Sequence, residues 1–177
     1  MKGKEGDRMK VIFLDIDGVL YPCRKRISPY TTFRFDREQL VKHYQCAAIR
    51  DLSDYDLACA QNGFAHSAIQ LLKTLIQKSN AVIVISSSWK FSHTLPQLKA
   101  LFAFYALQDA IVDSTSNDYG FLKTPAIRAY LKDHPNITQY IVVDDLNMEN
   151  EFHAKPQYEF SHCSWEHGWN VKFKKGS

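Results

Sequence analysis

The hydrophobic residues of this chain gather in short continuous runs that are separated by segments with helical spacing. VIFLD at 11–15, AVIVIS at 81–86 and YIVVDD at 140–145 are rich in β-branched residues, and AIVD at 110–113 is a shorter run of the same kind. Uninterrupted apolar runs of this length are typical of strands that are buried on both faces of a parallel sheet. We therefore predict four strands at these positions.

Between these runs, apolar residues recur at intervals of three and four. This spacing predicts helices at about 64–78, 94–105 and 125–133. Strands that alternate with helices favour an α/β fold, a doubly wound parallel sheet with helices on both faces and right-handed crossovers.

The segment 21–63 is harder to interpret, because it combines a basic patch, aromatic residues and a possible helix near 36–49. It is either an insertion over a functional site or a helical connector that covers one face of the sheet. Its length excludes a large independent cap domain. A chain of 177 residues supports one core, so we expect a single domain at 10–172 after a polar tail at 1–9, which is disordered or left over from cloning.

Composition and charge limit the partners and the cellular compartment that we expect for this protein. The formal net charge is +3 with basic residues spread along the chain, so no block indicates nucleic acid or membrane binding by itself. Four cysteines without a Cys-x-x-Cys pair favour reduced thiols over a disulfide or zinc framework. We find no signal peptide and no membrane span, and we expect a cytoplasmic monomer with no membrane partner.

Polar residues stand at the ends of three predicted strands: Asp15-Ile16-Asp17-Gly18, Ser86-Ser87-Ser88 and Asp144-Asp145. Ligands of open α/β sheets bind at the carboxyl ends of the strands. Asp15 and Asp17 are two residues apart in an extended segment, so their side chains point to one side while Ile16 points away. Adjacent carboxylates repel each other, and a hard divalent cation, Mg²⁺ above all, relieves that repulsion. The sequence therefore predicts a magnesium site at this edge.

Two other kinds of binding site are excluded by the sequence. In a calcium-binding loop that began at Asp15, Leu20 would occupy the position of the turn glycine and Arg26 that of the bidentate glutamate. A phosphate-binding loop of the Gly-x-x-x-x-Gly-Lys-Ser/Thr type is absent from the sequence, which excludes the common nucleotide triphosphatases.

The order of DxDGVL, a strand-end serine, a lysine and a strand-end DD resembles the haloacid dehalogenase (HAD) superfamily of phosphatases, over roughly residues 10–170. VISSSWK, FLKTPAIRAYL and YIVVDDLN are similar to a small, minimally capped branch that includes domains attached to RNA-repair proteins. The resemblance implies an HAD-like, Rossmann-like fold with a small or absent cap.

The resemblance also implies a role for each polar residue. Asp15 would attack phosphorus, Asp17 would act as general acid/base, Ser86 would bind the phosphoryl oxygens, and Lys123 would neutralise charge. Ser87 and Ser88 adjoin Ser86 and could share its contacts, while Lys90 and Arg128 are rivals of Lys123. The magnesium ligands would come from Asp15, Asp17, Asp144 and Asp145, and the choice between Asp144 and Asp145 for direct contact stays open.

We therefore expect a Mg²⁺-dependent phosphomonoester hydrolase that forms an aspartyl-phosphate intermediate. A small cap leaves the site open, which favours a bulky partner such as a phosphoprotein, including phosphotyrosine. The alternatives are a nucleic-acid end-repair phosphatase, which would need a basic groove, and a noncatalytic phosphate-binding module, which would have lost a carboxylate of the site.

The C-terminal sequence HCSWEHGWN is a weaker candidate site. His162, Cys163 and His167 suggest zinc, but a further Cys or carboxylate at ligand spacing is missing. Trp165 and Trp169 are expected to pack on the sheet edge, with stacking on a substrate as the alternative.

Overall fold

The computed structural model describes residues 8–22, 27–28, 31–146 and 148, and the backbone of 159–164 and 168–169. Within these residues the chain forms one six-stranded sheet with the strand order β3-β2-β1-β4-β5-β6. The strands are β1 (Met9–Leu14), β2 (Val82–Ile85), β3 (Ile111–Ser114), β4 (Ile137–Asp144), β5 (Glu159–Ser164) and β6 (Gly168–Trp169).

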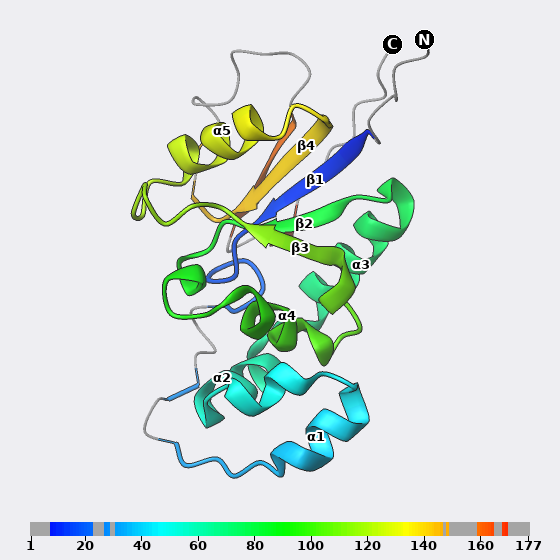
Figure 1. Cartoon of the computed structure of the whole chain (residues 1–177), viewed down its shortest axis with the longest axis vertical. Coiled ribbons are helices and arrows are strands. Elements are labelled where there is room, and N and C mark those ends of the chain that lie inside the picture. Colours follow the sequence, from blue (N-terminus) through cyan, green and yellow to red (C-terminus); the bar gives the residue numbers. More distant parts are fainter. Residues whose placement is uncertain are drawn as a thin grey trace.

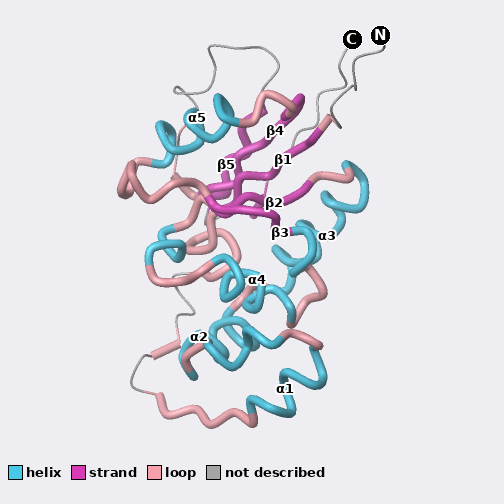
Figure 2. Tube along the Cα trace, in the orientation of Figure 1, coloured by secondary structure: helices cyan, strands magenta, loops and turns pink. Residues whose placement is uncertain are grey.

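The strands β3, β2, β1, β4 and β5 pair in parallel, and only the short β6 pairs antiparallel, with β5. The strands form a single layer in Figure 2, with β1 between β2 and β4. A strand in this position is covered on both edges and both faces, which explains the uninterrupted apolar run from which the sequence predicted it. Its carboxyl end lies between the ends of its two neighbours.

Helices cover both faces of the sheet. The α-helices are α1 (Arg37–Tyr44), α2 (Asp54–Ala58), α3 (His66–Ser79), α4 (Leu95–Ala103) and α5 (Lys123–Asp133); shorter turns are η2 (Ala47–Asp51), η3 (Cys59–Gly63), η4 (Ser88–Phe91) and η5 (Gln108–Ala110). In Figure 1, α5 lies on one side of the sheet and α3 and α4 lie on the other. The structure thus confirms the predicted α/β class, with a parallel main sheet between two helical layers.

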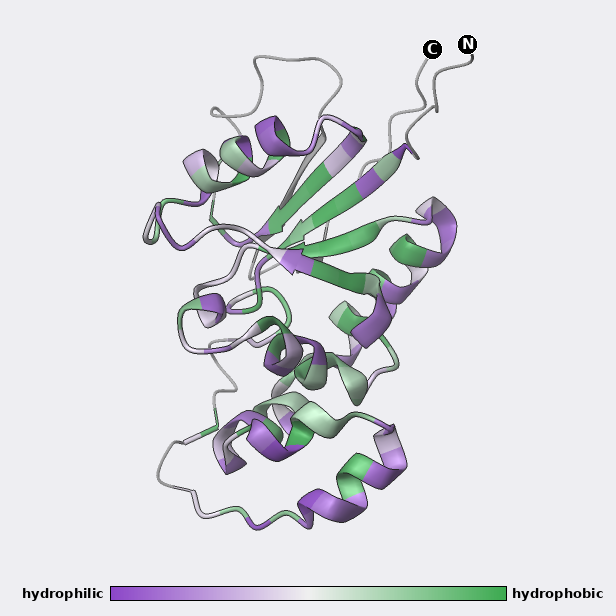
Figure 3. Cartoon of the chain, in the orientation of Figure 1, coloured by the Kyte–Doolittle hydropathy of each residue, from purple (hydrophilic) through white to green (hydrophobic). Residues whose placement is uncertain are grey.

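The sheet separates two hydrophobic clusters of buried side chains. In Figure 3 its central strands are mostly green, and the helices that cover it are partly purple. On the α5 side, the ring of Phe13 meets Tyr130 and Tyr140 edge-on, with centroids 5.7 Å away in both cases. Such edge-to-face pairs add to the free energy gained by burial. The larger cluster lies on the α3 and α4 side and continues into segment 21–63.

Segment 21–63 forms a small helical layer beyond α4, at the bottom of Figure 1. Ile49, Leu52 and Leu57 are buried in the larger core cluster, so this layer extends the main core. The Gln97 amide on α4 donates to the Asp51 carbonyl over 2.9 Å. The segment therefore covers α4, as a connector would, and its α2 also borders the pocket described below.

The element boundaries differ from the predictions in instructive places. The predicted helix at 36–49 is α1 followed by the 3-10 turn η2, because Gln45 adopts a left-handed conformation with φ of 51°. The first strand includes Met9, which we had placed in the polar tail. Of the rest of that tail, Arg8 is exposed and residues 1–7 lie outside the described residues. No described helix is long and apolar enough to cross a membrane.

Two parts of the fold were absent from the predictions. Strands β5 and β6 lie in a stretch that we had considered only for zinc binding and for aromatic packing. The side chains of His162, Cys163, His167, Trp165 and Trp169 lie outside the described residues, so both hypotheses stay predictions. Of the cysteines with described side chains, Cys46 and Cys59 are both free thiols.

Candidate active site

Asp15 and Asp17 lie in a tight turn that leaves the end of β1. The Asp15 amide donates to the Val143 carbonyl over 2.9 Å, which continues the β1–β4 pairing to the first carboxylate. The amides of Leu20 and Tyr21 both donate to the Ile16 carbonyl, at 2.9 and 2.8 Å. The Ile16 side chain is fully buried in the core. Ile16 is therefore turned into the core, as the sequence predicted.

Lys123 connects two of the strand ends. It is the first residue of α5, and its ammonium nitrogen lies 2.7 Å from Asp15 Oδ2 and 2.7 Å from Asp144 Oδ2. Both carboxylates are almost fully buried. An ammonium between two buried carboxylates offsets their mutual repulsion and the cost of removing them from water. Of the basic residues proposed for the phosphate, Lys123 is thus the one that lies among the acidic residues.

The rivals of Lys123 are placed differently. Lys90 is buried, and its ammonium donates to Thr115 Oγ1 over 2.8 Å and to the Ser116 carbonyl over 2.7 Å. Burial, followed by the nearby charge of Lys123, lowers the pKa of Lys90. It ties η4 to the loop that follows β3. Arg128 is exposed on the second turn of α5.

Three carboxylates converge where β1 and β4 end. Asp15, Asp144 and Asp145 each offer an oxygen, and these atoms lie within 4.8 Å of one another. Asp144 Oδ1 accepts the Leu146 amide over 2.9 Å, which fixes this side chain. Carboxylate oxygens are the donors that Mg²⁺ prefers, so the donor set fits this ion. Both members of the Asp144–Asp145 pair belong to the group.

The electrostatics reflect this crowding. Burial and the charge of Asp15 raise the pKa of Asp144 to about 6, although Lys123 acts in the opposite direction. The same causes raise the pKa of Asp145. Burial alone would lower the pKa of Lys123, but the charges of Asp15 and Asp144 outweigh it and raise that pKa. A divalent cation beside these groups would favour their ionised forms.

Ser86 and Ser87 bring hydroxyls to the same edge from β2. The Ser86 amide donates to the Leu14 carbonyl over 2.9 Å, which aligns the end of β2 with that of β1. Both serines are buried, and neither Oγ has a hydrogen-bond partner among the described residues. Buried hydroxyls normally have a partner, so two such groups at the edge of the sheet that carries Asp15 suit a ligand with several acceptor oxygens.

Asp17 has a different environment from Asp15. Its Oδ2 accepts the indole Nε1–H of Trp89 over 3.0 Å, and Asp17 is absent from the group of converging carboxylates. The two carboxylates therefore have separate partners, although the sequence suggested that both aim at one point. The separation suits two different chemical roles, while the assignment of Asp17 as a magnesium ligand has no support from its side chain.

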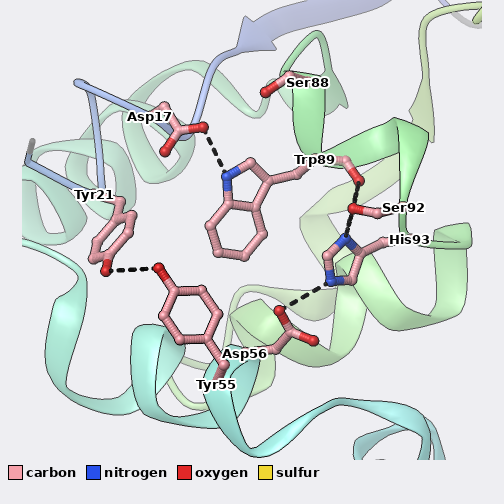
Figure 4. Close-up of a pocket in the computed structure, with 8 residues that line it drawn as sticks. All are labelled: Asp17, Tyr21, Tyr55, Asp56, Ser88, Trp89, Ser92 and His93. Carbon is pink, nitrogen blue, oxygen red and sulfur yellow. Dashed lines mark hydrogen bonds and ion pairs between the residues drawn. The ribbon is translucent and has the colours of Figure 1, made fainter. Parts of the chain in front are cut away.

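A pocket with a volume of about 380 Å³ opens beside Asp17 (Figure 4). It is lined by Tyr21, by Tyr55 and Asp56 of segment 21–63, and by residues of the η4 region after β2, namely Ser88, Trp89, Ser92 and His93. Segment 21–63 thus forms one wall of a pocket at the candidate acid/base. The walls combine aromatic rings with hydroxyls and charged groups.

Sequence reasoning missed Trp89, Asp56 and His93. Trp89 lies in the motif VISSSWK, directly after the serines, and its place next to a strand-end cluster was the available signal. Asp56 and His93 gave no signal, because they come from distant segments and meet only in the folded chain, with Nε2 of His93 3.3 Å from Asp56 Oδ1.

The fold and the strand-end residues define this chain as an HAD-like domain, whose general activity is phosphatase-type hydrolysis. Within that class, the chain belongs to the family described as the HAD domain in Swiss Army Knife RNA repair proteins, whose model matches residues 11–171. The match confirms the resemblance inferred from the motifs. No curated protein and no solved structure gave a significant match.

Proposed function

We propose that this protein is a Mg²⁺-dependent phosphomonoester hydrolase that forms an aspartyl-phosphate on Asp15. The observation that carries the proposal is the position of Asp15, buried at the central strand end with Lys123 2.7 Å away and Asp144 and Asp145 beside it. These residues would hold Mg²⁺, which when bound would supply positive charge to the phosphoryl oxygens.

In the first half-reaction an Asp15 carboxylate oxygen attacks phosphorus and the bond from phosphorus to the ester oxygen breaks. Asp17, in its protonated form, gives its proton to the departing oxygen. The Lys123 ammonium and the two serine hydroxyls would stabilise charge on the remaining phosphoryl oxygens. The products of this step are the free alcohol and a phosphorylated Asp15.

In the second half-reaction the ionised Asp17 takes a proton from water. The resulting hydroxide attacks phosphorus, the bond between phosphorus and Asp15 breaks, and inorganic phosphate leaves. Asp15 is again a carboxylate and Asp17 is again protonated. One carboxyl group thus serves as acid and then as base, and it needs access to both the departing alcohol and the incoming water.

For the substrate, we propose a phosphate on a large molecule. Segment 21–63 adds only a small helical layer, which supports access for a bulky group such as a phosphoprotein with phosphotyrosine. A phosphorylated nucleic-acid end is the second candidate, and the family description, which refers to RNA repair proteins, favours it. The net charge of +3 does not favour one of these two substrates over the other.

The test is a phosphatase screen with Mg²⁺, Ca²⁺ or a chelator. It should include p-nitrophenyl phosphate, phosphotyrosine and phosphoserine peptides, and RNA with terminal phosphates. We expect turnover with Mg²⁺ and none with Ca²⁺, because the larger ion recruits more ligands and disturbs the in-line geometry. Asp15→Asn should abolish turnover. The acid-stable labelling of the chain by a ³²P-substrate should disappear in the same variant. Full activity after exhaustive chelation would refute the magnesium requirement.

A further inference from the structure

Trp89 links the candidate acid/base to the walls of the pocket. Its indole N–H donates to Asp17 Oδ2 over 3.0 Å. The indole ring meets Tyr21 and Phe64 at steep angles, with centroids 6.2 and 6.3 Å away. Tyr21 and Phe64 stand at the two ends of segment 21–63, where it leaves and rejoins the main fold. The edge of the indole is thereby fixed relative to the strand end that carries Asp17.

His93 fixes the face of the same indole. The imidazole is stacked on Trp89 with a centroid distance of 5.5 Å and an interplanar angle of 20°. Its Nδ1 lies 3.0 Å from the Trp89 carbonyl oxygen and its Nε2 lies 3.3 Å from Asp56 Oδ1 (Figure 4). Both contacts are donor bonds when the ring carries two protons, which the neighbouring carboxylate favours.

Asp56 is itself held in place by the start of α2. Its Oδ2 accepts the Ser53 amide over 3.0 Å and the Ser53 hydroxyl over 2.6 Å, in a capping box. A continuous set of contacts therefore leads from α2 through Asp56, His93 and Trp89 to Asp17. None of these side chains, Asp17 included, belongs to the group of carboxylates that converges around Lys123.

We propose that Trp89 is a positioning residue for the proton-transfer steps, and that segment 21–63 supports it through Asp56 and His93. The inference rests on the proposed function, since it requires Asp17 to act as acid and base. A carboxylate on a turn must be held in one orientation for efficient transfer, and a fixed N–H donor does so. The competing explanation is that the indole N–H simply needs an acceptor.

Trp89→Phe tests the proposal, because it removes the N–H and keeps an aromatic ring. The matched control is Tyr105→Phe, which removes the hydroxyl that donates to the Ala60 carbonyl of segment 21–63 and keeps the ring that stacks on Phe64. The rates compared are kcat/KM for p-nitrophenyl phosphate and for phosphoserine, with Mg²⁺. The aryl ester has a good leaving group and needs little protonation, whereas the serine alkoxide needs it.

For Trp89→Phe we expect kcat/KM to fall about tenfold for phosphoserine and clearly less for p-nitrophenyl phosphate. Tenfold is the loss typical of one hydrogen bond to a charged group, here the carboxylate that Asp17 becomes as its proton leaves. Tyr105→Phe should leave the ratio of the two rates unchanged. In the double variant with Asp17→Asn, loss of the indole donor should add nothing to the effect of Asp17→Asn alone. His93→Gln should move the ratio in the same direction by a smaller factor.

Equal losses for the two esters in Trp89→Phe, or independent effects in the double variant, would overturn the positioning role while leaving the phosphatase intact. No turnover by the unaltered chain on any tested ester would instead count against the proposed function. The contact itself is measurable without activity, because the sequence has three tryptophans and Trp89→Phe assigns one indole resonance by its absence. In ¹H–¹⁵N spectra that resonance should shift in Asp17→Asn, and an unmoved resonance would refute the contact.

Discussion

Gly18 lies directly against the Asp145 side chain, so that a Cβ at Gly18 would collide with Asp145 Oδ2. Gly18 also has a positive φ of 75°, a conformation that residues with a side chain adopt at a cost. One glycine thus permits the turn after β1 and the approach of a strand-end carboxylate from β4. The small residue of the DxDG motif has two physical reasons to be there.

We predict that Gly18→Ala destroys activity and costs more stability than a change of backbone conformation alone. Gly120→Ala is the matched control, because Gly120 has a φ of 54° but nothing lies within 4 Å of a Cβ built on it. The control should lose about 1 kcal/mol of unfolding free energy and keep its activity. Urea unfolding and Mg²⁺-dependent turnover measure both effects. Equal behaviour of the two variants would mean that Asp145 moves aside without consequence.

Replacement of Lys123 should separate metal binding from turnover. The ammonium lies among the carboxylates proposed to hold Mg²⁺, so Lys123→Met removes a competing positive charge. We expect Mg²⁺ to bind several-fold more tightly and turnover to fall at least about a hundredfold, since the phosphoryl charge is no longer neutralised. Lys132→Met changes the same charge in the exposed last turn of α5 and should alter neither quantity. Calorimetric titration with Mg²⁺ measures the affinity. Weaker Mg²⁺ binding by Lys123→Met than by the unaltered chain would contradict the prediction.

Asp17→Asn should affect the two half-reactions differently. Formation of the phosphorylated Asp15 should slow much more for a phosphoserine peptide than for p-nitrophenyl phosphate, because only the alkoxide needs a proton. Hydrolysis of the intermediate should slow equally for both, because the intermediate is the same. Rapid-quench kinetics resolve the two steps. The same slowing of the first step for both esters would make Asp17 an organiser of the site without a role as acid.

The Asp56–His93 pair should give stability a defined pH dependence. The hydrogen bond from Asp56 raises the pKa of His93, so its contribution is full below the unfolded histidine pKa and is lost as pH rises through the folded value. Burial works to raise the pKa of Asp56, but His93 and Ser53 outweigh it and lower that pKa, so its contribution is lost as pH falls through the folded value.

Both contributions to stability are present between about pH 4 and pH 6.5, which are the ordinary pKa values of aspartate and histidine side chains. The unfolding free energy of the unaltered chain should exceed that of Asp56→Asn by at most about 1 kcal/mol in this window, and the difference should shrink above and below it. The groups that face the imidazole are Asp56, the Trp89 carbonyl and Ser92. Urea titrations at several pH values measure the difference, and a difference that grows above pH 8 would contradict the assignment.

The sequence by itself determined the main sheet and the chemistry at its edge. Buried parallel strands need continuous apolar runs, so β1, β2 and β4 could be predicted from the sequence. The carboxyl ends of parallel strands lie at one edge of the sheet, so Asp15, Ser86 and Asp144 had to come to the same edge. These are properties of local pattern and of sheet geometry, which hold before any side chain is placed. The boundary after α1 depends on a single residue in a left-handed conformation, and it could not be predicted from the sequence.

Only the tertiary structure decided how the charges are distributed. Spacing placed Asp15 and Asp17 on one side of the chain, but the turn at Gly18 and the arrival of Trp89 gave them separate partners. Likewise, the sequence favoured Lys123 but left Lys90 as a rival, and folding placed Lys123 among carboxylates and Lys90 against the oxygens of Thr115 and Ser116. Residues distant along the chain meet through packing of whole helices, and no local pattern encodes that meeting.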